Sequence, residues 1–557
     1  MKKISGLFAL MLLLASCSGK ENQLEPFVKP APIVVNPEEG STVYGIVSCK
    51  GKGVPGVNVT DGFEIVTTDK DGIYQLPSEK RFGIVYITVP SGYEAPAVGV
   101  VPQIKKDLLC KPTVVERKDF ELKYVGDQTN HTMFVFGDMH LANKRSDIKQ
   151  FGYLVNDLNN YIKDHSGEKV YGLTLGDMTW DIYWYANNFG FPEYLKEMNK
   201  VNNFSVYHTI GNHDHNMKTE VDGDKQGWDN VNWDCEKAFI SNLNPTYYSF
   251  NIGKVHYIVL DDILCLNFTG GVSESRRYQD FLYVDNLLWL YKDLSYVDKS
   301  TPVVIALHCP VMKNDGSYYL QNAGDLLAAL DGFKDVTFLS AHTLEINNIN
   351  INGYREYNSG AVCGRTWYAG YYHKTLNLGS DGAPGGYRKI VYNGTKSTST
   401  YIGTGRPDNY QFRAYDRNCI KLDAASVGIT KSPNKEYYEE YVTKYGGYDK
   451  ASSANEIIID VFDYDERWKI EVMENGNPLD VVRIKNSYDP LFLLAYTSER
   501  YKQYETNNVN ATVSSHLFKA TAGSATSTVE IKVTDDEGRV YTETMIRPKA
   551  FTIANYE

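Results

Sequence analysis

The chain has 557 residues, a length that suggests about three or four domains. Hydrophobic residues make up 42% and charged residues 23%, which is an ordinary globular balance and argues against global disorder. The formal net charge is -12, so no nucleic acid is expected as a partner.

The first 17 residues have the pattern of an export signal. Lys2 and Lys3 precede the apolar run Leu7–Leu14, which is too short to span a membrane. The run ends in Leu14-Ala15-Ser16-Cys17, which is similar to the lipobox of bacterial lipoproteins, where the signal is cut before the cysteine and the thiol is acylated. The alternative is an ordinary signal with an incidental cysteine. We expect an exported bacterial lipoprotein, anchored to a membrane through Cys17 and facing the periplasm or the cell surface.

Residues 18–40 contain several prolines among polar residues, which predicts an extended linker. Residues 41–125 follow with short β-runs such as Val43–Val47, Val57–Val59 and Ile73–Leu76, separated by turn-forming residues. This spacing predicts a small β-sandwich. It has no cluster of His, Asp or Cys with a catalytic pattern, so we expect it to be structural or to position the next domain.

Residues 130–395 alternate apolar β-runs with helical stretches. Met133–Phe136, Val170–Leu175 and Pro302–Leu307 are typical of buried strands, whereas Ile148–Ile162 and Phe281–Leu294 have helical periodicity. This alternation predicts an α/β domain.

From residue 403 to residue 557 the β-signals return. Glu456–Phe462 and Ser527–Val533 are typical of strands, and Asp535–Gly538 is typical of a turn. We therefore expect a second β-rich domain, a β-sandwich, at the C-terminal end.

Potential metal ligands follow the predicted strands of the middle domain. Their positions, in chain order, are Asp138, His140, Asp177, Asn212, His213, Asp214, His308 and His342. Ligands gather at the carboxyl ends of strands in open α/β sheets, so we expect one metal cluster, although each histidine taken singly could be an ordinary core or surface residue. Carboxylates, imidazoles and an amide without thiolate suit zinc, manganese or iron. A carboxylate shared by two ions fits a two-metal hydrolytic site.

In this order, Asp138-x-His140, Gly176-Asp177, Gly211-Asn212-His213-Asp214 and His308-x-Pro310 resemble the calcineurin-like metallophosphoesterase superfamily. The flanking β-domains are similar to those of an exported bacterial lipoprotein group within it. The resemblance implies a multidomain fold, in which a central αββα domain of two packed β-sheets flanked by helices lies between two β-sandwich domains.

The resemblance also implies a ligand set for two divalent metal ions, manganese, iron or zinc. Asp138 and His140 would bind the first ion, and Asp177 would bridge both ions. The second ion would be held by Asn212, His308 and His342. Phosphate mono- or diesters would then be hydrolysed by a metal-bound hydroxide, with a phosphorylated small molecule, glycan or lipid as the substrate.

Two further residues receive catalytic roles from the resemblance. His213 would lie near the scissile phosphate and protonate the leaving oxygen as a general acid. Asp214 would orient the imidazole of His213. Trp180 and Asp181 lie beside these motifs, and contact with the substrate and simple packing both stay open for them.

The sequence departs from the family pattern at one ligand. Where the family has Gly-His-x-His, this chain has Ala341-His342-Thr343-Leu344, and a leucine cannot bind a metal. Leu344 therefore weakens the first site, for which water, Glu345 or His215 could supply a replacement ligand. An open coordination position can still be catalytic. The alternative function is a degenerate, non-catalytic surface protein that binds a phosphorylated glycan or lipid.

Overall fold

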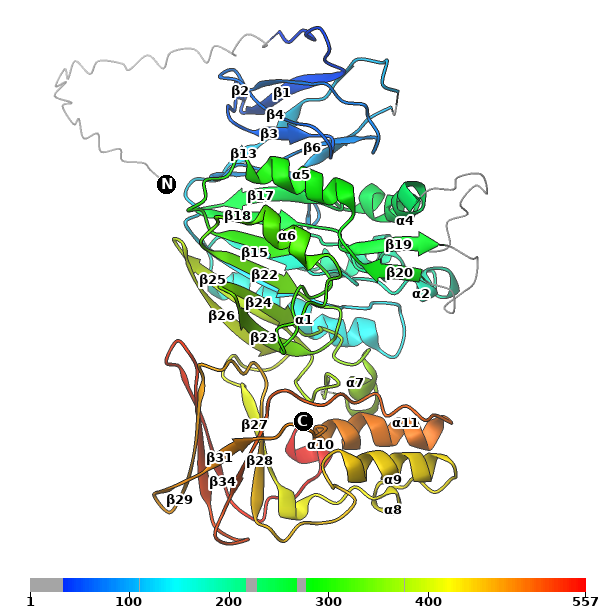
Figure 1. Ribbon diagram of the computed structural model, residues 1–557, viewed down its shortest axis with the longest axis vertical. Coiled ribbons are helices and arrows are strands. Elements are labelled where there is room, and N and C mark those ends of the chain that lie inside the picture. The colour runs from blue at the N-terminus through cyan, green and yellow to red at the C-terminus, as the bar shows by residue number, and fades with distance from the viewer. Residues whose placement is uncertain (1–33, 110, 217–227, 268–276, 375) are drawn as a thin grey trace, which may run out of the picture. The chain divides into compact units, whose positions relative to one another are not determined.

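The computed structural model describes residues 34–109, 111–216, 228–267, 277–374 and 376–557 (Figure 1). The proposed export signal with Cys17, and the linker up to residue 33, lie outside these ranges. Among the helices in these ranges, none is long and apolar enough for a membrane crossing. From Val35 to Glu557 the chain forms one compact unit.

The N-terminal domain is a β-sandwich. Its first sheet is centred on β1 (Val43–Cys49), which pairs with β2 (Lys52–Gly53), β5 (Ile73–Leu76), β11 (Glu116–Arg117) and β12 (Phe120–Glu121). The second sheet has the order β10 (Lys105–Asp107), β6 (Ile84–Ile87), β3 (Asn58–Thr60) and β4 (Ile65–Thr67). Two short ladders complete it: β7 (Tyr93–Glu94) with β13 (Lys123–Tyr124), and β8 (Ala97–Val98) with β9 (Val101–Pro102). Apolar side chains from both sheets, such as Val43 and Val59, share one buried core.

The middle domain contains two β-sheets that pack against each other. The first has the order β16 (Ser205–Tyr207), β15 (Val170–Thr174), β14 (Asn130–Phe136), β25 (Gly386–Asn393) and β26 (Lys396–Gly403). The second has the order β17 (Tyr248–Ile252), β18 (Val255–Val259), β21 (Val303–Ala306), β22 (Val336–Ser340), β24 (Tyr354–Ser359) and β23 (Ile346–Ile351). His131 of β14 hydrogen-bonds Tyr257 of β18 across the two sheets at 2.7 Å. A separate hairpin is formed by β19 (Ile263–Asn267) and β20 (Arg277–Asp280).

Helices cover the outer faces of these two sheets. The amphipathic helix α1 (Asp147–Asp164) packs on the first sheet, where its Tyr161 ring lies 5.0 Å from the ring of Phe134. On the side of the second sheet, Trp289 of α5 (Val284–Leu294) lies 5.4 Å from the ring of Tyr247. The remaining helices are α2 (Ile182–Ala186), α3 (Phe191–Met198), α4 (Trp228–Asn242), α6 (Ala323–Ala329) and α7 (Tyr368–His373). The expected αββα arrangement is confirmed. Because β26 pairs with β25, the domain extends to Gly403 rather than to residue 395.

The C-terminal domain combines a β-sandwich with a helical layer. One sheet has the order β27 (Phe412–Asp416), β28 (Glu456–Val461), β32 (Leu517–Thr521) and β31 (Val481–Arg483). The other has the order β30 (Asn477–Leu479), β29 (Lys469–Glu474), β33 (Val529–Thr534) and β34 (Val540–Met545). The helical segments are η1 (Arg417–Cys419), α8 (Ala424–Val427), α9 (Asn434–Lys444), α10 (Pro490–Phe492), the π-helix η2 (Leu493–Thr497), α11 (Ser498–Gln503) and η3 (Ile553–Asn555). The helical layer has its own buried core, which also takes in Tyr368 of α7.

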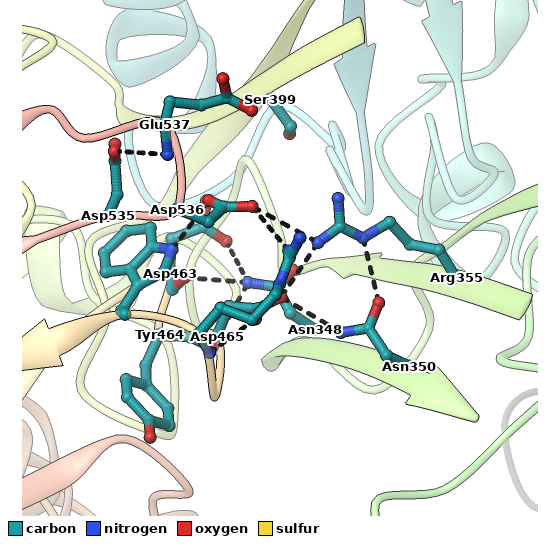
Figure 2. Close-up of polar contacts among 12 residues, drawn as sticks. Asn348, Asn350, Arg355, Ser399, Asp463, Tyr464, Asp465, Asp535, Asp536 and Glu537 are labelled. Carbon is teal, nitrogen blue, oxygen red and sulfur yellow. Dashed lines mark hydrogen bonds and ion pairs between the residues drawn. The ribbon is translucent and has the colours of Figure 1, made fainter. Parts of the chain in front are cut away.

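Polar contacts fix the C-terminal domain against the edge of the second sheet. Figure 2 shows Asn348, Asn350 and Arg355, from β23 and β24, facing the carboxylates after β28. Asn348 donates to Asp463 at 2.9 Å, and Arg355 donates to Asp465 at 3.1 Å. Asn348 lies on β23, the strand that directly follows the His342–Leu344 segment, so the C-terminal domain contacts the strand next to a candidate ligand loop.

Candidate metal centre

The predicted ligands lie where strands end, and both sheets of the middle domain contribute. Asp138, Asp177 and Asn212 follow β14, β15 and β16 of the first sheet. His308 and His342 follow β21 and β22 of the second sheet. Because the carboxyl ends of these parallel strands meet at one edge, residues distant in the sequence form one buried cluster.

Four of these residues have a backbone conformation that side chains other than glycine rarely adopt. The φ angles are 42° for Asp138, 43° for His140, 53° for Asp177 and 65° for His342. Hydrogen bonds between the loops hold them there: His140 N–H donates to the carbonyl of Asp177 at 2.9 Å, and His342 N–H donates to Asp138 Oδ2 at 2.9 Å. Strained backbone of this kind concentrates at functional sites.

Four potential ligand atoms converge at the predicted second metal site. Nε2 of His308 lies 2.9 Å from Oδ1 of Asn212, 3.0 Å from Nδ1 of His342 and 3.4 Å from Oδ2 of Asp177. Nδ1 of His342 is 3.1 Å from the same Asn212 oxygen. Nδ1 of His308 donates to the carbonyl of Leu175 at 2.7 Å, so in a neutral imidazole Nε2 presents its lone pair to this cluster.

The electrostatics of this cluster favour a cation. Burial and the neighbouring His308 lower the pKa of His342 to about 3, so this imidazole is neutral at physiological pH. Burial lowers the pKa of His308, but the Asp177 carboxylate raises it. The pKa of His308 is about 10 as a result. The Asp177 carboxylate thus favours positive charge beside His308. Oxygen and imidazole nitrogen donors in this set fit a divalent metal ion.

The predicted first metal site has fewer ligand atoms. Nε2 of His140 lies 3.5 Å from Oδ1 of Asp138 and 3.5 Å from Oδ2 of Asp177. Oδ1 of Asp138 is buried and accepts no hydrogen bond from any described residue, which a bound cation would remedy. Burial alone would raise the pKa of Asp177, yet His308 and His213 hold it well below its ordinary value. An ionised Asp177, with Oδ2 near both His140 and His308, lies between the two sites.

Neither protein residue considered as a replacement for the missing ligand reaches the first site. Nδ1 of His215 is 2.8 Å from the carbonyl of Gly211, and its Nε2 is 3.5 Å from Asp261. Glu345 lies beside Asp381, and burial together with that carboxylate raises its pKa to about 7. His213 lies close to this site, since ligand atoms of His140, Asp177 and His213 all lie within 4.8 Å of one another.

The structure corrects the expected partner of His213. Nδ1 of His213 lies 2.8 Å from Oδ1 of Asp181, while its backbone N–H donates to Asp177 Oδ1 at 2.7 Å. The carboxylate of Asp214, which we expected to orient His213, instead accepts backbone N–H groups of Met178, Thr179 and Gly211 at 3.1–3.2 Å. The tight turn at Gly211–Asp214 directs the side chains of adjacent residues to different sides, so sequence adjacency did not predict contact.

A cavity of about 480 Å³ lies over the candidate metal ligands. Its wall includes His140, Asp177, His213 and His342, together with Leu344 at the position of the missing ligand. The C-terminal domain also contributes to this wall, through Tyr496, Arg500 and Asn510, which no sequence pattern predicted. A larger cavity of about 770 Å³, lined by residues such as Asn160 and Lys163, contains none of the candidate ligands.

Two family models match the chain. Residues 41–125 match the N terminal of Calcineurin-like phosphoesterase, and residues 356–541 match the C terminal of Calcineurin-like phosphoesterase. The candidate ligands from Asp138 to His342 lie between the two matched segments. No curated protein matches this sequence.

Several solved structures are distantly similar. Purple acid phosphatase PPD1 from yellow lupin has 12% identity and a TM-score of 0.33, with 64% of this chain and 68% of that chain covered. GAP50, the anchor in the inner membrane complex of Plasmodium, has 13% identity and a TM-score of 0.31, with 49% and 85% covered. Vps29 from Entamoeba histolytica, complexed with zinc, has 11% identity and a TM-score of 0.24, with 48% and 91% covered.

Proposed function

We propose that the middle domain is a metal-dependent phosphoesterase, because two segments of this chain match the models for the N terminal and the C terminal of Calcineurin-like phosphoesterase. It would hydrolyse phosphate mono- or diesters at a site for two divalent cations. The observation that supports this proposal most is the convergence of Asp177, Asn212, His308 and His342 on one point, with heavy-atom distances between 2.9 and 3.4 Å.

The geometry gives each residue a part in the reaction. Bound divalent cations would supply a nucleophile from water at neutral pH and offset the charge of the phosphoryl oxygens. Asp177 is ionised and would hold both cations, and the bond from His308 to Leu175 fixes the tautomer that leaves Nε2 available. His213 lines the cavity and is held at Nδ1 by Asp181, so it is placed to give a proton to the leaving oxygen.

The proposal is tested by metal content and turnover together. Purified protein is exposed to manganese, iron or zinc and analysed for bound metal, and hydrolysis of p-nitrophenyl phosphate and bis(p-nitrophenyl) phosphate is then measured. We expect about two equivalents of metal and hydrolysis that a chelator abolishes. Asp177→Asn should remove both the bound metal and the hydrolysis, and its circular dichroism spectrum should be unchanged. Hydrolysis that survives in a folded Asp177→Asn variant would exclude the bridging role.

The second candidate function is a non-catalytic surface protein that binds a phosphorylated glycan or lipid. Leu344 favours it, because this side chain occupies the cavity wall where the family pattern has a histidine, and neither His215 nor Glu345 replaces it. One equivalent of metal or none, without turnover of either ester, would support this function instead.

We also propose, from the sequence alone, that the protein is an exported bacterial lipoprotein anchored through an acylated Cys17. Mass spectrometry of the mature N-terminus tests this proposal. Release of a Cys17→Ser variant from the membrane fraction is expected, and a variant that stays fully membrane-bound would contradict the anchor.

A further inference from the structure

Three arginines from separate segments line the cavity over the metal centre. Arg145 lies between β14 and α1, Arg365 lies between β24 and α7, and Arg500 belongs to α11 of the C-terminal domain. They share the cavity wall with the candidate ligands His140 and His342. In a chain with a net charge of -12, this is a local concentration of positive charge at the site itself.

These guanidinium groups lack a carboxylate ion-pair partner among the described residues. In contrast, Arg355 and Arg388 at the domain interface pair with Asp465 and Asp463 at 3.1 and 2.8 Å. Nε of Arg500 is buried and has no hydrogen-bond partner among the described residues. A guanidinium group has five N–H donors, and among the described residues only the hydroxyl of Tyr496 accepts a hydrogen bond from Arg500.

An aromatic ring holds two of the arginines in place. The guanidinium carbon of Arg145 lies 3.4 Å from the ring centroid of Tyr368, and that of Arg500 lies 5.6 Å from the same centroid. Nη1 of Arg500 also lies 3.4 Å from the hydroxyl of Tyr496. A guanidinium over a ring face is attracted by the ring quadrupole, while its N–H groups still point outward in its own plane. The ring contacts therefore order both arginines, and within the described ranges only Nη1 of Arg500 also donates, to Tyr496.

The backbone near each arginine is irregular. Arg145 has a φ of 54°, and Thr366, next to Arg365, has a φ of 56°. Arg500 follows the π-helix η2, which carries Tyr496. Single π-turns and left-handed residues cost conformational energy and are found mostly at functional sites.

We propose that Arg145, Arg365 and Arg500 form a binding site for a second phosphate group of the substrate. The inference rests on the proposed function, in which the metal centre takes the phosphate that is hydrolysed. The planar fork of arginine matches the oxygens of a phosphate, and charge-assisted hydrogen bonds of this kind are among the strongest in proteins. A cavity of about 480 Å³ has room for two phosphates and part of an organic group. The substrate class is therefore an organic bisphosphate or diphosphate.

The first experiment compares two matched esters. Phosphate release from glucose 6-phosphate and glucose 1,6-bisphosphate is measured with the full metal-loaded protein. We expect kcat/KM to be at least about tenfold higher for the bisphosphate, and Arg500→Gln to reduce this ratio by about tenfold. Lys502→Gln is the matched control, because Lys502 lies on the same helix, is exposed, pairs with Glu499 and does not line the cavity. Equal kcat/KM values for the two esters in the wild type would overturn the inference.

The second experiment separates this inference from the proposed hydrolysis. Inorganic pyrophosphate is titrated into metal-free protein in a calorimeter, where turnover plays no part. We expect pyrophosphate to bind, Arg500→Gln and Arg145→Gln each to weaken binding by about tenfold, and Lys502→Gln to leave it unchanged. If neither sugar phosphate is hydrolysed but this pattern holds, the arginine site stands and the hydrolytic proposal fails. Absent binding, or binding insensitive to both arginine variants in folded protein, would overturn the site.

Discussion

The contact between His213 and Asp181 gives the sharpest prediction for catalysis. Nδ1 of His213 and Oδ1 of Asp181 are 2.8 Å apart, and the two side chains are only 18% and 10% exposed. A charge-assisted hydrogen bond contributes about 1.5–3 kcal/mol. Asp181→Asn keeps an acceptor of the same shape but removes the charge, so we expect a loss of about 2 kcal/mol, or roughly 30-fold in rate.

The assay uses a series of phosphate esters that differ only in the leaving group. Esters with poor leaving groups need the proton that His213 donates, whereas activated aryl esters do not. Asp181→Asn should therefore reduce kcat strongly for an alkyl phosphate and only slightly for p-nitrophenyl phosphate. Asp214→Asn is the matched comparison, because its carboxylate accepts backbone N–H groups of the ligand loops. That variant should lower the melting temperature and affect all esters alike.

Two results would refute this reasoning. One is an equal loss on alkyl and aryl esters in Asp181→Asn, which would show that the carboxylate does not act through proton donation. The other is a dependence on the leaving group in Asp214→Asn but not in Asp181→Asn, which would restore the partner expected from the sequence.

Three further predictions concern metal retention and stability. Leu344→His should slow the loss of the more weakly held metal ion during dialysis against a chelator. The φ of 60° at this position suits histidine better than leucine. An unchanged rate of metal loss would contradict this prediction. His516 is buried, which lowers its pKa, but Asp460 and Asp381 raise that pKa to about 10, so its stabilisation is complete below about pH 6.5 and is lost as the pH rises towards 10. Calorimetry should show the melting temperature falling over this window, and His516→Asn should flatten the fall. Arg388→Met breaks a buried ion pair of 2.8 Å and should lower the free energy of unfolding by about 3–5 kcal/mol in a denaturant titration, whereas a loss below 1 kcal/mol would show that the pair is dispensable.

The strands, and the candidate ligands that follow them, could be predicted from the sequence because the patterns that indicate them are local. A continuous apolar run such as Met133–Phe136 indicates a buried strand, and a polar residue directly after it lies at the sheet edge whatever the rest of the fold does. The backbone conformation of these polar residues is not local in the same way, since Asp138 and His140 both have left-handed backbone.

The remainder of the site depends on contacts that sequence spacing does not encode. The pairing of His213 with Asp181 is set by the direction of two loops, and Asp181 had no pattern of its own. Arg500 reaches the cavity because the C-terminal domain packs on β23, which no local signal predicts. Helix α9 was missed because it buries only Asn434, Tyr438 and Val442, too few for a clear periodic pattern.

Because the C-terminal domain attaches to β23, metal binding and substrate selection are assigned to different domains. The candidate metal ligands all come from the middle domain, whereas Tyr496, Arg500 and Asn510 come from the other. Substitutions on α11 can then alter which substrates enter without disturbing the strained ligand loops. In this architecture, mutations in the C-terminal domain can change substrate selectivity during evolution, while the candidate metal ligands of the middle domain stay the same.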